Sequence, residues 1–567
     1  MPKVARSKKV RVSYVADFET TTDPEDCRVW GWGIVGVFDA EYEHVRIGHD
    51  LASFIDWIQD KDANVYFHNL KFDGVFIVDR LMREGYTVNR TQRKSEPGQM
   101  KTVIDKMGKF YSITVVWKNG KVCEFRDSVK KLPMTLKKVA IAFGLEETKG
   151  EIDYHKPRPV GYRMTWEEQD YLRRDVVIIA KALRMEMDEG MTKLTVASDS
   201  MTEFKRLFGE ENFKRVFPVL PPSMDAEIRQ SYRGGFTYAD PRFSGEVQGS
   251  GLVLDVNSLY PHIMYDKVLP YGEPVYVRGY PEPNEKRPLA IFSVTFTAEI
   301  KEDHIPCIQI KGQSLFGATE YLSRIREPTT LWVTNVDWAL WNDHYDIDVQ
   351  SYNGGWAFRG SKGFFQTYID KWMEVKATSK GGKREIAKLH LNSLYGKFGS
   401  NPDVTGKFPS LVDNRIKLIL GAEESRAPVY TAMASFVTAY ARELTIRAAQ
   451  ANYGTFAYAD TDSLHLLTDD VPEALEVHPS KLGAWKLEYH FQNAMYVRAK
   501  FYLERGCTDP KGEYVEYVNR VAGMPEEASK RLTFDAVYDG NKIGGKMTPQ
   551  IVPGGVVLRE GTFTINL

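Results

Sequence analysis

Strand-like and helix-like patterns of hydrophobic and polar positions alternate over the first ~195 residues. Short apolar runs at 12–17, 29–38 and 64–69 are typical of buried strands, whereas residues 165–190 repeat apolar positions at helical spacing. Strands and helices that alternate in this way pack as layers. The pattern therefore predicts an α/β domain at the N-terminus.

The pattern changes several times in the rest of the chain. A proline-rich segment at 218–222 predicts a linker, and a second α/β region begins near residue 232. The hundred or more residues after Asp255 are rich in Gly, Pro and strand-forming residues. Helical spacing returns at 364–395 and again at 432–451. The last ~45 residues predict short strands joined by glycine turns, so the chain is expected to form several domains.

Composition narrows the class of protein but names no partner. Hydrophobic residues make up 43% and charged residues 27% of the 567 residues, which excludes disorder, collagen and coiled coil. Lys and Arg number 75 and Asp and Glu 76, so a nucleic-acid-binding protein would need its positive charge gathered locally. The four cysteines have no C-x-x-C spacing, and no uncharged apolar run reaches 18 residues. We expect an intracellular protein that does not enter a membrane.

A first set of acidic residues has the spacing of a metal site. Asp17 and Glu19 lie two residues apart and share a face of a strand, where two like charges are unfavourable without a cation. Asp73 follows a His-Asn pair, and Tyr171 lies one helical turn before Asp175. Four carboxylates and a phenol suit two-metal phosphodiester hydrolysis. The alternative is that they are unrelated surface residues.

A second acidic set is split between two distant segments. Residues 251–255 form a short apolar strand that ends at Asp255, and the strand-like run 456–464 turns at Asp460-Thr461-Asp462. Asx-turn chemistry explains most turns with two Asp. Taken together with Asp255, however, the turn resembles the palm motifs of family B DNA polymerases. That resemblance implies two metals that activate a primer 3′-hydroxyl and hold a triphosphate for in-line attack.

A basic segment lies between the two halves of the second set. Residues 361–398 contain eight Lys or Arg against three Asp or Glu, a local charge of +5 in a chain of net −1. Arg384, Lys388, Asn392 and Tyr395 share one face of the expected helix. A solvated basic face is the alternative to a phosphate-binding face.

The first set resembles the DnaQ-like 3′–5′ exonucleases, the proofreading domain of many DNA polymerases. That resemblance implies that Asp17, Glu19, Asp73 and Asp175 are metal ligands and that Tyr171 orients the attacking water. It also implies that Thr20, Asn69, Phe72 and Ser128 bind a single-stranded 3′ end, supported by Lys149 and Tyr154.

The second set resembles the palm and fingers motifs of family B DNA polymerases: D-x-x-S-L-Y-P at 255–261, K-x-x-x-N-S-x-Y-G at 388–396 and Y-x-D-T-D-S at 458–463. The resemblance implies that Asp255, Asp462 and the carbonyl of Val256 bind metal, with Asp460 in the site, and that Tyr260 excludes a 2′-hydroxyl. It implies triphosphate contacts from Lys388, Lys371 and Lys376, and base-pair contacts from Asn392 and Tyr395. Lys500 and Tyr502 would contact the primer, and Tyr232, Arg233, Gly234, Gly235 and Phe236 the template.

The chain is most similar to the protein-primed polymerases of small tailed bacteriophages. This similarity implies an RNase H-like exonuclease domain (1–195) and a right-hand polymerase with a palm (196–266 and 426–525), fingers (364–399), a thumb (526–567) and two palm insertions (267–363 and 400–425). It also implies strand-displacing synthesis with proofreading, two Mg²⁺ per active site, and Mn²⁺ as an alternative ion. The expected partners are DNA, deoxynucleoside triphosphates (dNTPs), a priming terminal protein and a phage single-stranded DNA-binding protein. We expect a monomer in the cytoplasm of an infected bacterium.

Three other functions remain open at this point. A nuclease with an inactive polymerase platform would not need the intact carboxylates at 255, 460 and 462. A non-enzymatic replication scaffold would show no metal-dependent activity and would leave both acidic sets without a purpose. Reverse transcription is disfavoured by Tyr260 and by the 388–396 motif, and extension on an RNA template would distinguish it.

Overall fold

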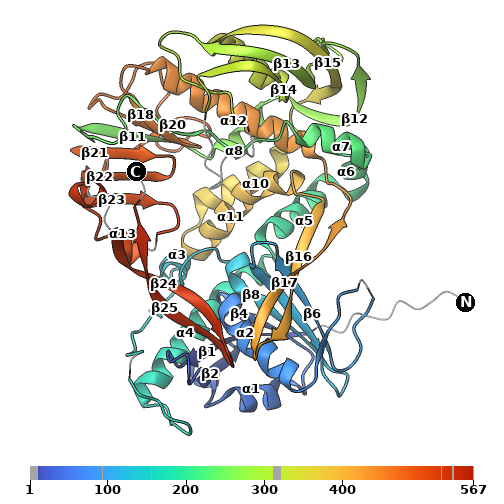
Figure 1. The fold of residues 1–567 in the computed structure, drawn as a ribbon, viewed down its shortest axis with the longest axis vertical. Coiled ribbons are helices and arrows are strands. Elements are labelled where there is room, and N and C mark those ends of the chain that lie inside the picture. The colour runs from blue at the N-terminus through green and yellow to red at the C-terminus, as the bar shows by residue number, and fades with distance from the viewer. Residues whose placement is uncertain are drawn as a thin grey trace, which may run out of the picture.

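A computed structural model describes residues 11–91, 93–147, 149–154, 156–310, 321–524, 526–538 and 542–565. The expected exonuclease domain, first insertion and thumb each include some residues outside these ranges. The chain forms a mixed α/β structure with several modules (Figure 1), as the sequence predicts. No helix in the described ranges combines the length and apolar character needed to cross a bilayer.

The N-terminal module is a layered α/β unit built on a mixed sheet. Side chains alternate across β1, so Val15 packs against the α3–α4 side of the sheet and Ala16 against the α1–α2 side. Strand β1 runs parallel to β4 and antiparallel to β2. The strands are β1 (Val12–Thr20), β2 (Val29–Gly36), β3 (Arg46–Gly48), β4 (Ala63–Phe67), β5 (Thr87–Val88), β6 (Gln99–Asp105), β7 (Phe110–Val116) and β8 (Val122–Asp127). The helices are η1 (Tyr42–His44), α1 (Leu51–Ile58), α2 (Leu70–Arg83), η2 (Ser128–Lys130), α3 (Leu136–Phe143) and α4 (Trp166–Asp188).

The predicted elements of this module are confirmed, with small shifts at their ends. The helix expected at 165–190 is α4, which begins after a capping box between Thr165 and Glu168. The strand expected at 64–69 stops at Phe67 because Asn69 has a φ of 83°, a left-handed conformation that no strand continues. That turn points the first residues of α2 back across the strand ends.

The second module is an antiparallel sheet that carries the palm residues. Its strand order is β10-β21-β22-β20-β11-β19-β18-β9, with β23 paired to β22. The strands are β9 (Thr237–Ala239), β10 (Val247–Gln248), β11 (Gly251–Val256), β18 (Phe456–Asp460), β19 (Ser463–Leu466), β20 (Trp485–Phe491), β21 (Asn493–Arg498), β22 (Phe501–Thr508) and β23 (Tyr514–Val521). Helices α8 (Leu259–Asp266) and α12 (Thr431–Ala451) share its core.

A separate four-stranded sheet, ordered β12-β15-β13-β14, lies at the end of the molecule opposite the N-terminal module (Figure 1). Its elements are β12 (Leu269–Val277), β13 (Leu289–Ile300), β14 (Arg324–Thr334), α9 (Asn335–His344) and β15 (Tyr345–Ser361). Four helices, α5 (Val196–Phe208), α6 (Glu210–Val216), α7 (Pro222–Arg229) and α10 (Gln366–Thr378), lie between these modules with α11 (Gly381–Phe398). The single helical stretch expected at 364–395 is thus two helices, because Gly381 has a φ of 54° at the break.

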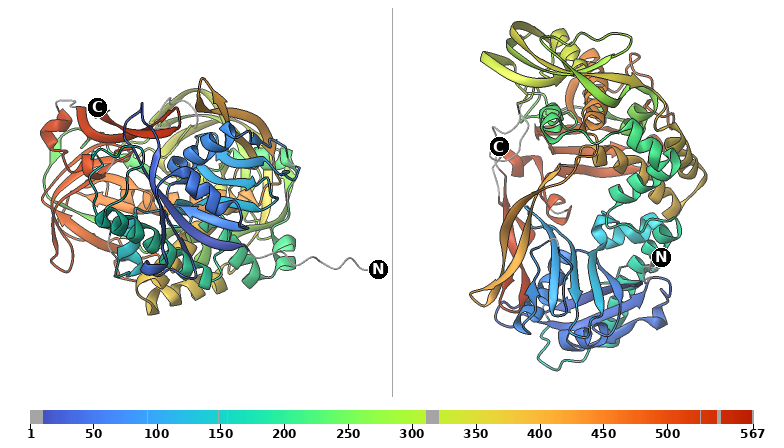
Figure 2. Two further views of the ribbon diagram at one scale, coloured as in Figure 1. Left: turned by 90° about the horizontal axis from the view of Figure 1, so that it is seen from below. Right: turned by 90° about the vertical axis from the view of Figure 1, so that its right-hand side faces the viewer.

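Two long hairpins reach from the palm side to the N-terminal module (Figures 1 and 2). One consists of β16 (Asp403–Val412) and β17 (Arg415–Ser425), and β16 pairs with β6, so this hairpin extends the N-terminal sheet. The other consists of β24 (Lys542–Val552) and β25 (Gly555–Thr564), which pack on α2. Helices α13 (Glu526–Ser529) and α14 (Phe534–Tyr538) precede it. The expectation of only short C-terminal strands was wrong, since two long paired strands form instead.

Candidate active sites

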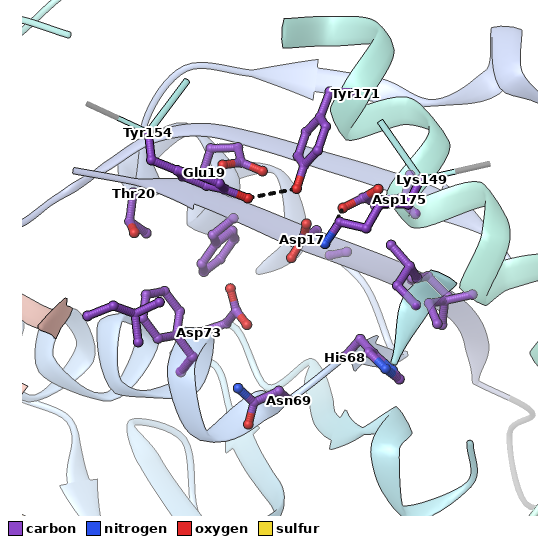
Figure 3. A pocket seen from close by; sticks show the side chains of 18 of the residues that line it. Asp17, Glu19, Thr20, His68, Asn69, Asp73, Lys149, Tyr154, Tyr171 and Asp175 are labelled. Atoms are coloured by element: carbon purple, nitrogen blue, oxygen red, sulfur yellow. Dashed lines mark hydrogen bonds and ion pairs between the residues drawn. The ribbon is translucent and has the colours of Figure 1, made fainter. Parts of the chain in front are cut away.

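The first acidic set converges on one cavity in the N-terminal module (Figure 3). Asp17 and Glu19 occupy alternate positions of β1 and lie on the side of the sheet that faces α4. Helix α4 supplies Tyr171 and Asp175, which are one turn apart. Asp73 comes from the first turn of α2. All five side chains line a cavity of about 280 Å³.

Two further side chains complete the polar wall of this cavity. The hydroxyls of Tyr154 and Tyr171 are 2.9 Å apart and share a hydrogen bond. The Lys149 Nζ lies 4.0 Å from the nearer carboxylate oxygen of Asp175. Because Lys149 is the nearest cation, it partly offsets the charge of the carboxylates around it. The arrangement places a phenol and an ammonium beside a concentrated negative charge.

Burial and mutual repulsion shift the acidity of all four carboxyl groups. Loss of hydration raises the pKa of Asp17 to about 6, although Lys149 opposes this rise. Burial, with repulsion from Asp17, raises the pKa of Asp175 to about 7. Burial also raises the pKa values of Glu19 and Asp73 well above their ordinary range, and the neighbouring carboxylates raise them further. These four carboxyl groups therefore bind protons readily, unless a metal cation takes the place of the protons.

The donor set of this cavity suits divalent cations. One buried carboxylate oxygen of Asp73 and one of Asp175 have no hydrogen-bond partner, which leaves them free to accept a metal. Carboxylate oxygens are the ligands that Mg²⁺ and Mn²⁺ prefer. In the described ranges, no three His, Cys, Asp or Glu side chains are already arranged to hold an ion.

We expect the 3′-trimming activity that the sequence predicts for this site to be lost as the pH falls through about 7 to 6. A carboxylate with a raised pKa is ionised, and able to bind metal, only above that pKa. Lys149→Met removes a charge that lowers the pKa values of Asp17 and Asp175, so it should move the midpoint of the pH profile upward by roughly 0.5–1 unit. The measurement is the initial rate of 3′ trimming of single-stranded DNA from pH 5 to 9.

A higher Mg²⁺ concentration should lower the midpoint of this profile, because cation and proton compete for the same oxygens. This shift serves as the internal control, since it appears in both the parent protein and the Lys149→Met variant. An unchanged midpoint in Lys149→Met would contradict the electrostatic role given to the lysine.

The second acidic set meets in the palm sheet. Strand β11 pairs antiparallel with β19, and this register places Asp255 opposite Ser463, the residue after Asp462. The backbone N–H of Val256 donates to the carbonyl of Asp462 at 2.8 Å. Asp255, Val256 and Asp462 all line a cavity of about 640 Å³. Segments some two hundred residues apart in the sequence thus form one acidic floor.

Burial and the repulsion from Asp462 and Glu488 raise the pKa of Asp255 to about 8. Burial likewise raises the pKa of Asp462. Lys486 opposes the rise at Asp255 and donates to Glu488 at 2.6 Å. As in the first cavity, two buried carboxyl groups of like charge would be relieved by a divalent cation.

The predicted basic helix face forms the opposite wall of the palm cavity. Arg384, Lys388, Asn392 and Tyr395 on α11 all line it, together with Lys376 on α10. The Lys376 ammonium donates to the Ser258 hydroxyl at 3.0 Å. The ring of Tyr260 stacks on the ring of Tyr395 with centroids 4.0 Å apart. The cavity is therefore lined by carboxylates, by cations and by a stacked aromatic pair.

Comparison with known proteins agrees with this geometry. A family model for DNA polymerase type B, organellar and viral, matches residues 56–478. The DNA polymerase of Bacillus phage phi29 is 43% identical over 98% of this chain and 99% of its own. That of Bacillus phage Nf is 42% identical over 98% and 100%, and that of Streptococcus phage Cp-1 is 31% identical over 98% and 98%. The chain belongs to the type B DNA polymerases.

Solved structures of phi29 DNA polymerase superpose on this type B polymerase over nearly its full length. The complex with primer-template DNA matches with a TM-score of 0.93 at 42% identity, covering 98% of this chain and 100% of that one. The complex with primer-template DNA and incoming nucleotides matches with a TM-score of 0.91 at 43% identity and the same coverage. The chain is a DNA-directed DNA polymerase of this type.

Several predicted site residues of this type B polymerase lie outside the two cavities. Asp460 does not line the palm cavity, because its carboxylate accepts from Thr237 at 2.9 Å and from Lys500 at 2.9 and 3.1 Å. Lys371 is 2.5 Å from Glu203 on α5 instead of facing the cavity. Ser128 is fully buried and hydrogen-bonds to His68 at 2.9 Å. The other predicted single-strand contacts, Thr20, Asn69, Phe72 and Tyr154, do line the first cavity.

Hydrogen bonds to backbone carbonyls fix the position of the predicted template segment at 232–236. The Arg442 guanidinium donates to the carbonyls of Arg233 and Gly234 at 3.0 and 2.7 Å. A Cβ at Gly235 would lie 2.8 Å from the Thr461 side chain, so the chain needs glycine there. The side chains of Arg233 and Phe236 are buried, and they stabilise the segment instead of facing outward.

Several residues that line the two cavities were not predicted as site residues from the sequence. Leu558 of β25 lines the first cavity, although it is more than five hundred residues from the carboxylates of β1. Lys486 and Glu488 of β20 line the palm cavity. His68 lines the first cavity beside the predicted Asn69. A contact from a distant strand, such as that of Leu558, depends on the tertiary fold and has no local pattern.

Proposed function

We propose that this polymerase also removes nucleotides from DNA 3′ ends at the cavity around Asp17, Glu19, Asp73 and Asp175. The observation that carries this proposal is that two acidic cavities exist and share no lining residue. One cavity suffices for nucleotide addition, so the other is available for a separate reaction. A solved structure of phi29 DNA polymerase is a complex with single-stranded DNA, and it matches this chain with a TM-score of 0.91 at 42% identity.

In this proposal two Mg²⁺ ions per site, or Mn²⁺ in their place, would activate the attacking oxygen and stabilise the leaving oxygen. In the first cavity the ligands would be Asp17, Glu19, Asp73 and Asp175, with Tyr171 orienting the water and Tyr154 holding the Tyr171 hydroxyl. Lys149 offsets the charge that accumulates near the scissile phosphate. In the palm cavity the ligands would be Asp255, Asp462 and the carbonyl of Val256.

The wall of the palm cavity fits an incoming dNTP. Lys376, Arg384 and Lys388 would neutralise the triphosphate, while Asn392 and Tyr395 pack on the base pair. The Tyr260 ring, fixed by stacking on Tyr395, would exclude a 2′-hydroxyl from the sugar position. Lys371 would reach the triphosphate only after leaving Glu203, and Lys500 and Tyr502 would lie along the primer strand.

We further propose that synthesis begins on a hydroxyl of a terminal protein and proceeds with strand displacement in the host cytoplasm. The sheet of β12–β15 would be the first palm insertion, and the β16–β17 hairpin the second. The first would bind the priming protein, and the second would enclose DNA together with the β24–β25 hairpin of the thumb. The fingers would be α10 and α11. A phage single-stranded DNA-binding protein would be a further partner of the monomer.

A priming assay tests this proposal. The polymerase is incubated with the candidate terminal protein of the same phage, Mg²⁺ and one labelled dNTP at a time, without any DNA primer. We expect one labelled nucleotide to become covalently joined to the terminal protein, and the label to withstand denaturing electrophoresis. Extension of a DNA primer in the same preparation is the control for an active enzyme. Primer extension without labelled terminal protein would contradict protein priming.

A further inference from the structure

A fully buried carboxylate lies in the palm sheet and has no part in the chemistry described above. It is close to the turn at Asp460-Thr461-Asp462 between β18 and β19, called the catalytic turn below. Glu504 on β22 has no exposed surface. One of its oxygens accepts from His465 Nδ1 at 2.6 Å and from the Tyr496 hydroxyl at 3.0 Å. Its other oxygen accepts from the Tyr489 hydroxyl at 2.7 Å. A buried charge that is matched by three donors fixes the direction of each donor.

These three donors come from three different strands around β22. His465 lies on β19, three residues after Asp462, whereas Tyr489 lies on β20 and Tyr496 on β21. The Glu504 carboxylate therefore links β19, the strand that follows the catalytic turn, to β20 and β21. Glu504 belongs to none of the sequence motifs described above.

The aromatic rings held by Glu504 surround Tyr458, the residue two positions before Asp460. The ring of Tyr458 stacks on that of Tyr496 with centroids 5.5 Å apart and meets the His465 ring edge-on at 5.0 Å. Tyr502 packs against both Tyr458 and His465. A change at Glu504 would therefore be transmitted first to the position of Tyr458.

Tyr458 in turn holds Lys500. The Tyr458 hydroxyl accepts from the backbone N–H of Lys500 at 2.9 Å. Lys500 has a φ of 60°, a conformation that is unfavourable in a non-glycine residue and persists only where neighbouring contacts fix it. From this strained turn, the Lys500 ammonium reaches both carboxylate oxygens of Asp460.

We propose that Glu504 is a positioning residue for nucleotide incorporation, which acts through Tyr458 to hold Lys500 on Asp460. The chain of contacts runs from the buried carboxylate to the rings, from the Tyr458 hydroxyl to the Lys500 backbone, and from the Lys500 ammonium to the catalytic turn. The inference rests on the proposed placement of Lys500 beside the primer end. It makes Glu504 matter for catalysis although it touches neither DNA nor nucleotide.

The test uses Glu504→Gln in the full-length polymerase, because glutamine keeps the size but replaces one acceptor oxygen with a donor. One of the three donors then faces an N–H group, and the ring cluster must shift. We expect kcat for single-nucleotide incorporation to fall about tenfold, with KM for the dNTP within about twofold of the parent value. Trimming of single-stranded DNA in the other cavity should not change. Glu513→Gln, on the exposed turn before β23, is the matched control and should alter neither reaction.

A double-mutant cycle separates positioning from a general loss of stability. If Glu504 acts through Lys500, Glu504→Gln should add almost nothing to the defect of Lys500→Ala. Additive defects, or an unchanged kcat in Glu504→Gln, would overturn the inference while leaving the polymerase site intact. A normal rate in Lys500→Ala would instead refute the proposed role of Lys500, and the inference with it. If Glu504→Gln does not fold, Tyr496→Phe removes one donor only and should lower kcat in the same direction, or the inference is wrong.

Discussion

Asp462→Ala is expected to abolish nucleotide incorporation and to leave trimming of single-stranded DNA at the parent rate. Asp462 and Asp255 are the two carboxylates of the palm cavity that we propose as metal ligands, and removing Asp462 leaves only one of them. The loss should be on the order of 10³-fold or more, because transition-state charge at phosphorus is stabilised mainly by the cations held there. The other cavity shares no residue with this one, so its reaction should be unaffected.

The measurement is paired on one preparation of each variant: extension of a primer on a DNA template, and shortening of a labelled single strand, both in Mg²⁺. Asp470→Ala is the matched control, because Asp470 is exposed on the same segment and lines neither cavity. It should retain both activities. Joint loss of extension and trimming in a folded Asp462→Ala protein would contradict the assignment of one reaction to each cavity.

Residues that are close in sequence or share a regular period could be placed from the sequence. The alternation along β1 puts Asp17 and Glu19 on one face, and the 3.6-residue period of α11 puts Lys388, Asn392 and Tyr395 on another. Both faces line cavities in the structure. Local geometry fixes these positions, so no knowledge of the distant parts of the chain was needed.

Contacts between distant segments set side-chain positions that the sequence patterns do not reveal. Lys371 shares the basic helical region with Lys388, but Glu203 on α5 draws it away from the palm cavity. Arg233 and Phe236 belong to a glycine-rich segment typical of phosphate contacts, yet their side chains enter the core. A partner such as Glu203 has no fixed sequence spacing from the residue it binds, so a linear pattern cannot reveal it.

The arrangement of the modules was also only partly predictable. The β16–β17 hairpin lies within the expected second palm insertion, and its pairing with β6, which the sequence did not indicate, places it at the edge of the N-terminal sheet. An edge strand accepts any neighbour that offers free backbone groups, so its partner is set by the tertiary fold and not by side-chain pattern. The same holds for Leu558, which reaches the first cavity only because β25 packs on α2.

Asp17→Ala combined with Glu19→Ala should have the opposite effect to Asp462→Ala. Both carboxylates line the first cavity, where Asp17 raises the pKa values of Glu19, Asp73 and Asp175. Their removal should lower the trimming rate on the order of 10³-fold or more, because two of the four proposed metal ligands are lost. The rate of incorporation on a paired primer should not change. A primer with a mismatched 3′ end should persist in the variant, whereas the parent protein should remove the mismatch before extension.

The chain offers a close control for this variant, because Asp23 and Glu25 repeat the same spacing at exposed positions just beyond β1. Asp23→Ala combined with Glu25→Ala should trim single strands at the parent rate. The active-site variant should also resist heat at least as well as the parent, since burying like charges without a cation destabilises the folded state. A lower thermal midpoint together with slower extension would indicate that Asp17 and Glu19 support the fold of the module. In that case the loss of trimming would no longer locate the exonuclease reaction in this cavity.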